Sequence, residues 1–201
     1  SLVRQRVFSP IPSRFLATTV GYDFSCPNKY TEETFENHTV EAYYSSKYVQ
    51  KGGFIWVFPK RTGINVGIGS FEKGKKLRQS LGQFISSHPA GKRLRNLDGR
   101  FFVHLIPMIW DENFFELPCC GKDWALIGDA AGHVNSISGA GIYYAMKDGA
   151  LCASAILQGD LQLFEKGWRD AYEDELRFAA KTFPTYYSRL GLIFWLRYVF
   201  D

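Results

Sequence analysis

The stretch "ALIGDAAGHVNSISGAGIYYAMKDGALC", residues 125–152, is unusually rich in glycine, alanine and serine. It predicts a short buried strand at "WALIG", a glycine-rich loop, and a helix from Gly141 to about Leu157. The helix is expected because Ile142, Met146 and Gly149 recur at helical spacing. So many small residues are unusual for a packed core. They indicate either room for a ligand or tight packing of the backbone.

A dinucleotide-binding loop is the first candidate for this pattern, and the sequence does not fit it. After Gly139-Ala140-Gly141, the third glycine of the G-x-G-x-x-G motif is replaced by Tyr144. After Gly67-Ile68-Gly69 it is replaced by Glu72. No phosphate-binding P-loop occurs either, so nothing in the sequence predicts a site for the ADP half of a dinucleotide.

The stretch does supply two features that suit a polyhydroxylated ligand with an anionic end. Asp129 follows the expected strand, where a carboxylate can accept hydrogen bonds from hydroxyl groups. Gly139 and Gly141 are expected to expose backbone N–H groups at the start of the helix, where the helix dipole favours negative charge. The alternative is that Asp129 caps a turn and the glycines only permit close packing.

The segment "FIWVFPKRTGINVGIG", residues 54–69, predicts a β-hairpin that turns after Pro59. Phe54, Trp56 and Phe58 would share one face of the first strand. We expect Phe58 to lie opposite Asn65, which places Trp56 opposite Gly67 and Phe54 opposite Gly69. Rings would then face glycines across a groove, and a one-residue shift of the register would abolish it. A strand bend or bulge at the glycines is the alternative.

The remaining elements favour an α+β fold, with strands mostly first and helices last. "RFLATTVGYDF", "TVEAYYSSKYV" and "RFFVHLIP" are expected strands, and His104 in the last is interpreted as a core histidine. Helices are expected at 71–87, across "DLQLFEKGWRDAYEDELRFAAKTF" with a division at Gly167, and in the aromatic tail.

Composition narrows the class of protein. The chain has 201 residues, 46% of them hydrophobic and 22% charged, with a net charge of +4, which indicates a globular protein without a nucleic-acid-binding module. Its four cysteines are interpreted as reduced thiols, and no metal site is expected. The run 190–196 is too short to span a bilayer, so we expect a cytoplasmic protein for which peripheral membrane contact is the second interpretation.

Two motifs resemble known families. "GDAAGHVNSISGAGIYYAMKDG" resembles the second flavin-contacting motif of FAD enzymes built like p-hydroxybenzoate hydroxylase. "FIWVFPKRTGINVGIG" is similar to the aromatic-x-Trp-x-Phe-Pro, seven-residue, Gly-x-Gly pattern of the geranylgeranyl reductases, and the opening "SLVR" resembles residues that follow their Asp-Gly motif. The resemblance implies an FAD-dependent oxidoreductase that reduces isoprenoid double bonds, with a mostly antiparallel substrate domain and C-terminal helices.

The resemblance also implies roles for individual residues. Asp129 would bind the ribityl chain of FAD, and the backbone around Gly141 would face the pyrimidine edge of the flavin. The implied flavin-binding residues are Gly128, Asp129, Gly139, Ala140, Gly141 and Ile142. The implied residues for an isoprenoid or other long apolar molecule are Phe54, Trp56, Phe58, Gly67 and Gly69. No catalytic residue is assigned, because the cofactor performs the redox step.

The sequence departs from the family pattern in places. Ser136 stands where proline is usual, which predicts a less rigid loop, and Ala140 stands where a polar residue is common. The family's N-terminal dinucleotide-binding half has no counterpart, so we expect a fragment with three parts: a substrate-binding part at 1–118, a flavin-facing part at 119–158 and C-terminal helices at 159–201. The alternatives are a flavin monooxygenase or halogenase, and a binding module for apolar ligands without catalysis.

Overall fold

The computed structural model describes residues 2–35, 39–49 and 52–188. The chain divides into two compact units, one formed by Ala17–Leu105 and the other by Ser1–Leu16 together with Ile106–Asp201. Each unit has its own hydrophobic core. These units do not coincide with the three parts expected from the sequence, which remain a prediction about function.

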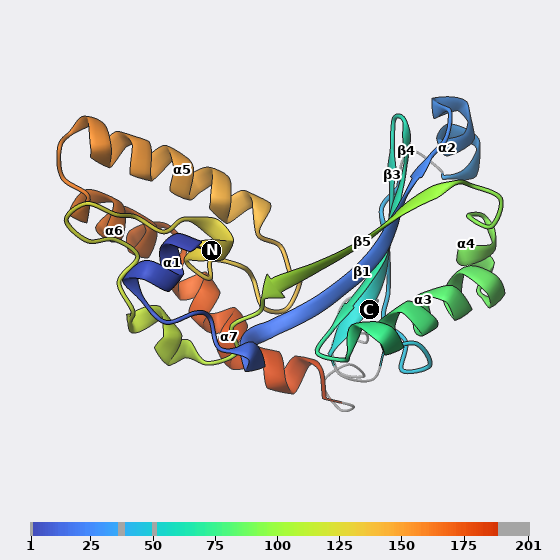
Figure 1. Cartoon of the computed structure of the whole chain (residues 1–201), viewed down its shortest axis with the longest axis horizontal. Coiled ribbons are helices and arrows are strands. Elements are labelled where there is room, and N and C mark those ends of the chain that lie inside the picture. Colours follow the sequence, from blue (N-terminus) through green and yellow to red (C-terminus); the bar gives the residue numbers. More distant parts are fainter. Residues whose placement is uncertain (1, 36–38, 50–51, 189–201) are drawn as a thin grey trace, which may run out of the picture. The chain divides into compact units, whose positions relative to one another are not determined.

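One sheet organises the unit 17–105. Among the described residues it has five strands in the order β2-β3-β4-β1-β5, with antiparallel pairing of β1 with β4, of β2 with β3 and of β3 with β4 (Figure 1). The α+β fold class is therefore confirmed. The strands are β1 (Leu16–Ser25), β2 (Glu41–Tyr43), β3 (Gly53–Lys60), β4 (Gly63–Ser70) and β5 (Gly99–Pro107).

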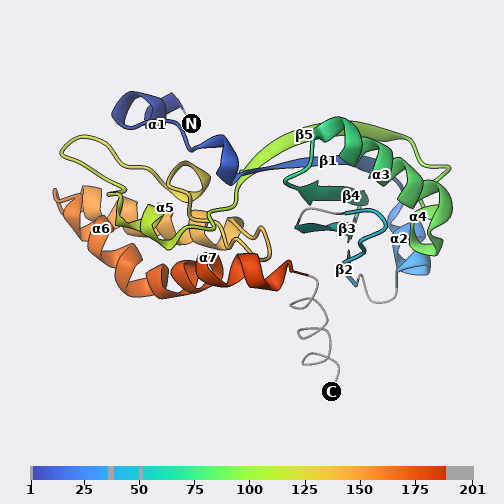
Figure 2. The same ribbon diagram turned by 90° about the horizontal axis from the view of Figure 1, so that it is seen from below.

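Helix α3 (Gly74–Ser87) lies along one face of this sheet (Figure 2). The spacing of apolar residues predicts a buried stripe of Leu77, Leu81, Phe84 and Ile85; the first three are fully buried and Ile85 is partly buried. They pack in one cluster with the alternating β-branched residues of β3 and β4, which gives this face a continuous apolar core. Two shorter helices, α2 (Asn28–Thr34) and α4 (Pro89–Lys92), complete the unit.

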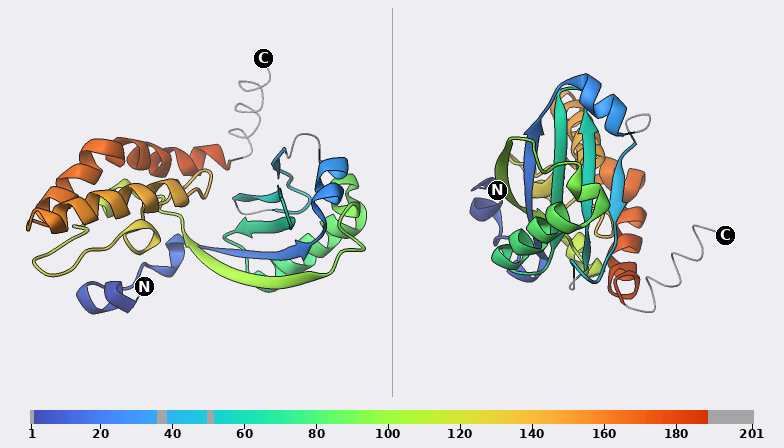
Figure 3. Two further views of the ribbon diagram at one scale, coloured as in Figure 1. Left: turned by 90° about the horizontal axis from the view of Figure 1, so that it is seen from above. Right: turned by 90° about the vertical axis from the view of Figure 1, so that its right-hand side faces the viewer.

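The other unit is mainly helical (Figure 3). Helices α5 and α6 contact each other, and a π-helical turn joins α6 directly to α7. The expected division of the long helix is thus a π turn that begins two residues after Gly167. The elements are α1 (Leu2–Val7), α5 (Ile142–Leu157), α6 (Gln162–Trp168), the π turn (Arg169–Glu173) and α7 (Asp174–Tyr186), with 3-10 turns at Ser13–Phe15, Glu112–Glu116 and Gly128–Ala130.

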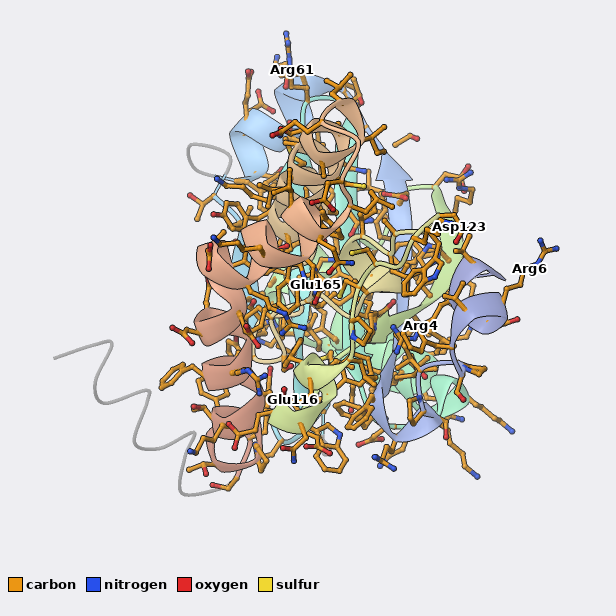
Figure 4. The ribbon with its side chains drawn as sticks, turned by 90° about the vertical axis from the view of Figure 1, so that its left-hand side faces the viewer. Arg4, Arg6, Arg61, Glu116, Asp123 and Glu165 are labelled. Atoms are coloured by element: carbon orange, nitrogen blue, oxygen red, sulfur yellow. The ribbon has the colours of Figure 1, made fainter. Side chains whose placement is uncertain are left out.

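Ion pairs connect the helices of this unit to the 3-10 turn at Glu112–Glu116. Arg169 pairs with Glu165 on α6 and with Glu173, while Arg177 on α7 pairs with both Glu173 and Glu116. Figure 4 shows Glu165 and Glu116 on these elements. Arginine can bridge two carboxylates at once because its guanidinium presents several donors in a fixed plane.

Several expected elements differ from the structure. The helix expected at 71–87 begins at Gly74, because Ser70 ends β4 and its hydroxyl accepts a hydrogen bond from the Glu72 N–H. "WALIG" is extended but forms only one bridge, Cys120 to Ala125, so the expected strand is wrong within the described residues. β2 covers three residues of "TVEAYYSSKYV", and helices α1 and α2 were not expected.

The tail helix expected from the aromatic C-terminal sequence falls at 189–201, outside the described residues. Across the residues that are described, no helix combines the length and the apolar character needed to cross a membrane.

Candidate functional site

The loop that begins at Gly128 is fixed to helix α5 at its first residue. Gly128 has a φ of +52°, and a methyl group at its Cα would lie 2.8 Å from the Cβ of Ala145. Its N–H donates to Oδ2 of Asp148, 2.7 Å away on α5. Glycine is therefore required here both by the backbone conformation and by the closeness of the helix.

Asp148 is the centre of a buried polar cluster. Its carboxylate also accepts hydrogen bonds from Tyr172 and from Nδ1 of His133, the latter at 2.8 Å. Asp148 and His133 are fully buried, and Tyr172 nearly so. A buried carboxylate is stable only when its oxygens are satisfied, so this cluster fixes the start of the loop to α5 and to the π turn that carries Tyr172.

Cys119 extends this cluster into an arrangement that resembles a cysteine–histidine–aspartate triad. Its Sγ lies 3.3 Å from Nε2 of His133, whose other nitrogen faces Asp148. Burial, together with the charges of Glu165 and Asp148, raises the pKa of the Cys119 thiol far above its ordinary value. A buried thiol that stays protonated is a poor nucleophile, and the hydrogen bonds of this cluster join the loop to α5 and to the π turn.

The middle of the loop, residues 135–140, forms a turn stabilised by its own hydrogen bonds. The side chain of Asn135 accepts from the N–H groups of Ile137 and Ser138. Ser136 is fully buried and donates to the carbonyl of Ile109, while the Tyr187 hydroxyl donates to the carbonyl of Ile137. The Ser136 hydroxyl thus anchors this point of the loop, and the lower rigidity expected from serine in place of proline stays a prediction.

The structure brings Asp129 to the start of α5. Gly141 is the N-cap of this helix, and no side chain caps the helix by a hydrogen bond. A methyl group on Gly141 would lie 2.9 Å from Oδ1 of Asp129. The carboxylate thus lies beside the helix N-terminus, and the role of the two in binding flavin stays a prediction.

Gly139 differs from its expected role. Its N–H donates to the carbonyl of Asn135 at 2.8 Å, so it is not available to a ligand. The residue instead has a φ of +71°, and a methyl group built on it would meet nothing within 4 Å. Gly139 therefore leaves open space beside the helix start, while Gly141 and Ile142 begin the helix.

The environment of Asp129 is partly dehydrated. The residue is exposed, yet the surrounding protein removes some of its water and raises the pKa of its carboxyl above the ordinary value of 3.8. On the same loop, the carbonyl of Ala130 accepts a hydrogen bond from Nη1 of Arg4 at 3.1 Å. Arg4 is 4% exposed and lies over the ring of Phe114 (Figure 4). Sequence reasoning gave Arg4 no role, although it belongs to the "SLVR" segment.

The register of the hairpin is confirmed. Phe54 lies opposite Gly69, Trp56 opposite Gly67, and Phe58 opposite Asn65. Strand β1 continues these rows, because Thr19, Gly21 and Asp23 lie opposite Gly69, Gly67 and Asn65. We call this side of the sheet the ring face. Helix α3 packs on the opposite side, where Ile55 and Val57 are fully buried.

The rings lie over the glycines and do not face an open groove. A methyl group on Gly67 would lie 2.1 Å from Cζ2 of Trp56, and one on Gly21 would lie 2.3 Å from Cζ of Phe102. At Gly69 the nearest atom, Cγ2 of Thr19, is 3.2 Å away. The groove expected between the rings and the glycines is therefore wrong at Gly67, because the Trp56 indole already occupies this space.

His104 is not a core histidine. It is exposed, and its ring stacks on that of Phe102 with a centroid distance of 5.4 Å. The interpretation failed because β5 is an edge strand of the sheet, so a histidine there can remain at the surface.

Comparison with known proteins places these features in a family context. The chain is 29% identical over 156 residues to a digeranylgeranylglycerophospholipid reductase of Methanocaldococcus jannaschii, covering 72% of this chain and 38% of the relative. It is 32% identical over 155 residues to a chloroplastic geranylgeranyl diphosphate reductase of Nicotiana tabacum, covering 72% of this chain and 29% of the relative. The chain is a homologue of the geranylgeranyl reductases. It spans well under half the length of these curated relatives.

The fold also occurs in proteins other than the reductases. A tryptophan 6-halogenase from Streptomyces toxytricini superimposes with a TM-score of 0.58 at 15% identity, over 88% of this chain and 34% of the halogenase. At this level of identity the likeness concerns the fold alone. No protein-family model matches the chain.

Proposed function

We propose that this chain is the substrate-binding and flavin-facing part of an FAD-dependent oxidoreductase that reduces isoprenoid double bonds. The observation that supports it most is the meeting of Asp129 with the open N-terminus of α5 at Gly141. The names of the related reductases supply the substrate class.

The residues at this site fit one end of FAD. Asp129 would accept hydrogen bonds from ribityl hydroxyls, and the first N–H groups of α5 would favour negative charge on the pyrimidine edge. Gly139 and Gly149 leave space in which a ring system can approach the backbone. Reduced flavin would supply the two hydrogens that saturate a double bond, and the chain's own residues would position the reactants and exclude water.

We infer that residues beyond this chain bind the ADP half of the cofactor. Supporting this, one side of α5 is apolar and exposed, with exposed fractions of 80% at Ile142, 71% at Met146 and 89% at Leu157. An exposed apolar helix face is typical of a surface that another part of a protein covers. The same inference accounts for the share of the relatives that this chain spans.

For the isoprenoid, we propose the ring face of the sheet. Phe54, Trp56 and Phe58 present half-buried or exposed rings in one row, with ring centroids 6.1 and 6.2 Å apart. A long hydrocarbon chain would gain free energy by covering such a surface.

The test uses the complete protein with chemically reduced FAD, without oxygen, and a geranylgeranyl substrate. We expect a product whose mass rises by two hydrogens for each double bond reduced. A product that gains oxygen or halogen only when oxygen or halide is present would support the monooxygenase or halogenase alternative. Tight binding of the lipid without any product would support the non-catalytic binding module.

A further inference from the structure

A row of hydrogen bonds fixes the position of the Trp56 indole on the ring face. Nε1 of Trp56 donates to Oδ1 of Asn65 at 2.6 Å, and Nδ2 of Asn65 donates to Oδ1 of Asp23 at 2.8 Å. Nζ of Lys60 donates to the same carboxylate oxygen, also at 2.8 Å. An ionised carboxylate only accepts, so Asp23 forces the amide nitrogen of Asn65 to face it and leaves the amide oxygen for the indole.

This row determines where the indole lies. Trp56 is only half-buried, and a side chain at the surface otherwise has several rotamers available. The hydrogen bond to Asn65 on β4 pulls the ring across the neighbouring strand, and Gly67 leaves the space for it to lie flat. Two features therefore fix the position of the indole: its hydrogen bond to Asn65, and the absence of a side chain on Gly67.

A second ring completes the surface from the other side. Gly21 on β1 lies opposite Gly67, and the ring of Phe102 on β5 covers it. Rings from β3 and β5 thus lie over glycines of β4 and β1, the two strands between them. The result is an apolar floor across β3, β4, β1 and β5, formed by Trp56 and Phe102.

We propose that Asn65 and Asp23 are positioning residues for the substrate: by holding Trp56 flat on Gly67 they shape the floor on which the hydrocarbon chain lies. The inference rests on the proposed function and adds two polar residues to the apolar ones named there. A flat floor suits an isoprenoid chain, because its double bonds keep successive carbon atoms in a plane that can stack on aromatic rings. Neither residue is expected to touch the reacting atoms.

The experiment exchanges the two polar residues in the complete protein. Asn65→Asp alone puts two carboxylates within hydrogen-bonding distance, so their repulsion should release the indole. The double variant Asn65→Asp/Asp23→Asn restores one amide and one carboxylate, so the amide at position 23 can donate to the carboxylate at position 65, which still accepts from the indole. The hydrogen bond from Lys60 is not restored, because it shares the oxygen that the amide nitrogen replaces. Steady-state kinetics with a geranylgeranyl substrate would give KM and kcat for each.

We expect Asn65→Asp to raise KM by about threefold to tenfold with kcat within about twofold, because the floor contributes to binding and not to chemistry. The double variant should return KM to within about twofold of the parent. Glu41→Gln is the matched control, since it weakens the Glu41–Arg93 pair on the α3 side of the same sheet. It should leave KM unchanged.

A second readout reports on the ring itself. The difference in fluorescence between each protein and its Trp56→Phe counterpart isolates the Trp56 signal from the other tryptophans. Asn65→Asp should shift this signal toward that of a solvated indole, and the double variant should reverse the shift. An unchanged KM in Asn65→Asp, or a double variant no better than the single one, would overturn the proposal while the reductase activity stands. Absence of any isoprenoid reduction by the parent would overturn both.

Discussion

Two glycine-rich regions of this protein differ in what lies beside particular glycines. In the sheet, Gly67 lies under Trp56 and Gly21 under Phe102, so the chain fills the space with its own rings. In the flavin-facing segment, a methyl group at Gly139 or Gly149 would meet nothing within 4 Å. Covered glycines thus build a flat surface, whereas uncovered glycines leave room for something else.

The difference has a structural basis. Strand side chains alternate between faces, so a ring on one strand can reach across to a glycine on the next. In the loop, the Phe114 ring covers Gly132 and Asp148 binds the N–H of Gly128, but among the described residues no side chain lies beside Gly139. The outer side of the loop stays open at the place where Asp129 meets the helix start.

The largest effect should come from removing the anchor beneath the loop. Asp148→Ala leaves the donors of Gly128, His133 and Tyr172 without their acceptor, and should lower the free energy of unfolding by about 3–5 kcal/mol. Asp129→Ala is the matched control, because removing this exposed carboxylate should change the free energy of unfolding by less than about 0.5 kcal/mol. Urea unfolding of the 201-residue chain measures both. Equal losses of unfolding free energy in the two variants would contradict the distinction between the buried anchor Asp148 and the exposed Asp129.

Alanine substitutions at Gly67 and Gly69 should lower the unfolding free energy by different amounts, because a ring lies closer to Gly67. Gly67→Ala must displace the Trp56 indole, and should cost about 1–3 kcal/mol of unfolding free energy. Gly69→Ala needs only a small shift of Thr19, so its cost should stay below about 1 kcal/mol. Thermal unfolding followed by near-ultraviolet circular dichroism would compare them. A harmless Gly67→Ala would show that the indole does not lie where the structure has it.

Alanine substitutions at the two open glycines, Gly139 and Gly149, should change the stability of the chain in opposite directions. Gly139→Ala forces a side chain into a left-handed backbone conformation and should cost about 1–2 kcal/mol. Gly149→Ala lies within α5 with space around it, and should stabilise the chain by about 0.5–1 kcal/mol because alanine favours helix. Denaturant midpoints of the two variants give the comparison. Destabilisation by Gly149→Ala would mean that its surroundings are not open.

The smallest expected effect is the change with pH in the stability that Asp23 contributes. Hydrogen bonds from Asn65 and Lys60 lower the pKa of Asp23 below its ordinary value of 3.8. A lowered folded-state pKa contributes stability that is complete above the unfolded value and is lost as the pH falls through the folded one. The difference in unfolding free energy between the parent and Asp23→Asn should therefore shrink between about pH 5 and about pH 2. It should be small, because the carboxylate is 34% exposed. A difference that grows toward low pH would contradict the hydrogen-bond row.

Much of the ring face could be predicted from the sequence. Alternation in "FIWVFP" and "INVGIG" assigned each residue to a face, and the turn length left only a choice of register, which the structure confirms. What the sequence could not give is the direction of each ring. Whether Trp56 stands away from the sheet or lies on Gly67 depends on Asn65 and on Asp23, which is distant in sequence.

The loop was harder to predict. Asp129 and Gly141 were placed together by motif, but the buried cluster of Cys119, His133, Asp148 and Tyr172 was not foreseen. No short-range spacing connects these residues, and they meet only because two loops, which carry Cys119 and His133, pack against α5 and the π turn. A polar residue on the buried side of α5, such as Asp148 among apolar neighbours, is the one signal that could have indicated it.

The central claim is that Asp129 and the start of α5 at Gly141 face the cofactor, whereas the covered glycines of the sheet do not. It is tested most directly by the dissociation constant of FAD in the complete protein, measured by flavin fluorescence for Gly141→Val and Gly67→Ala. A side chain at position 141 would displace the Asp129 carboxylate, so we predict affinity weaker by about tenfold or more. Gly67→Ala should bind FAD within about twofold of the parent. Equal affinities for the two variants would contradict the account.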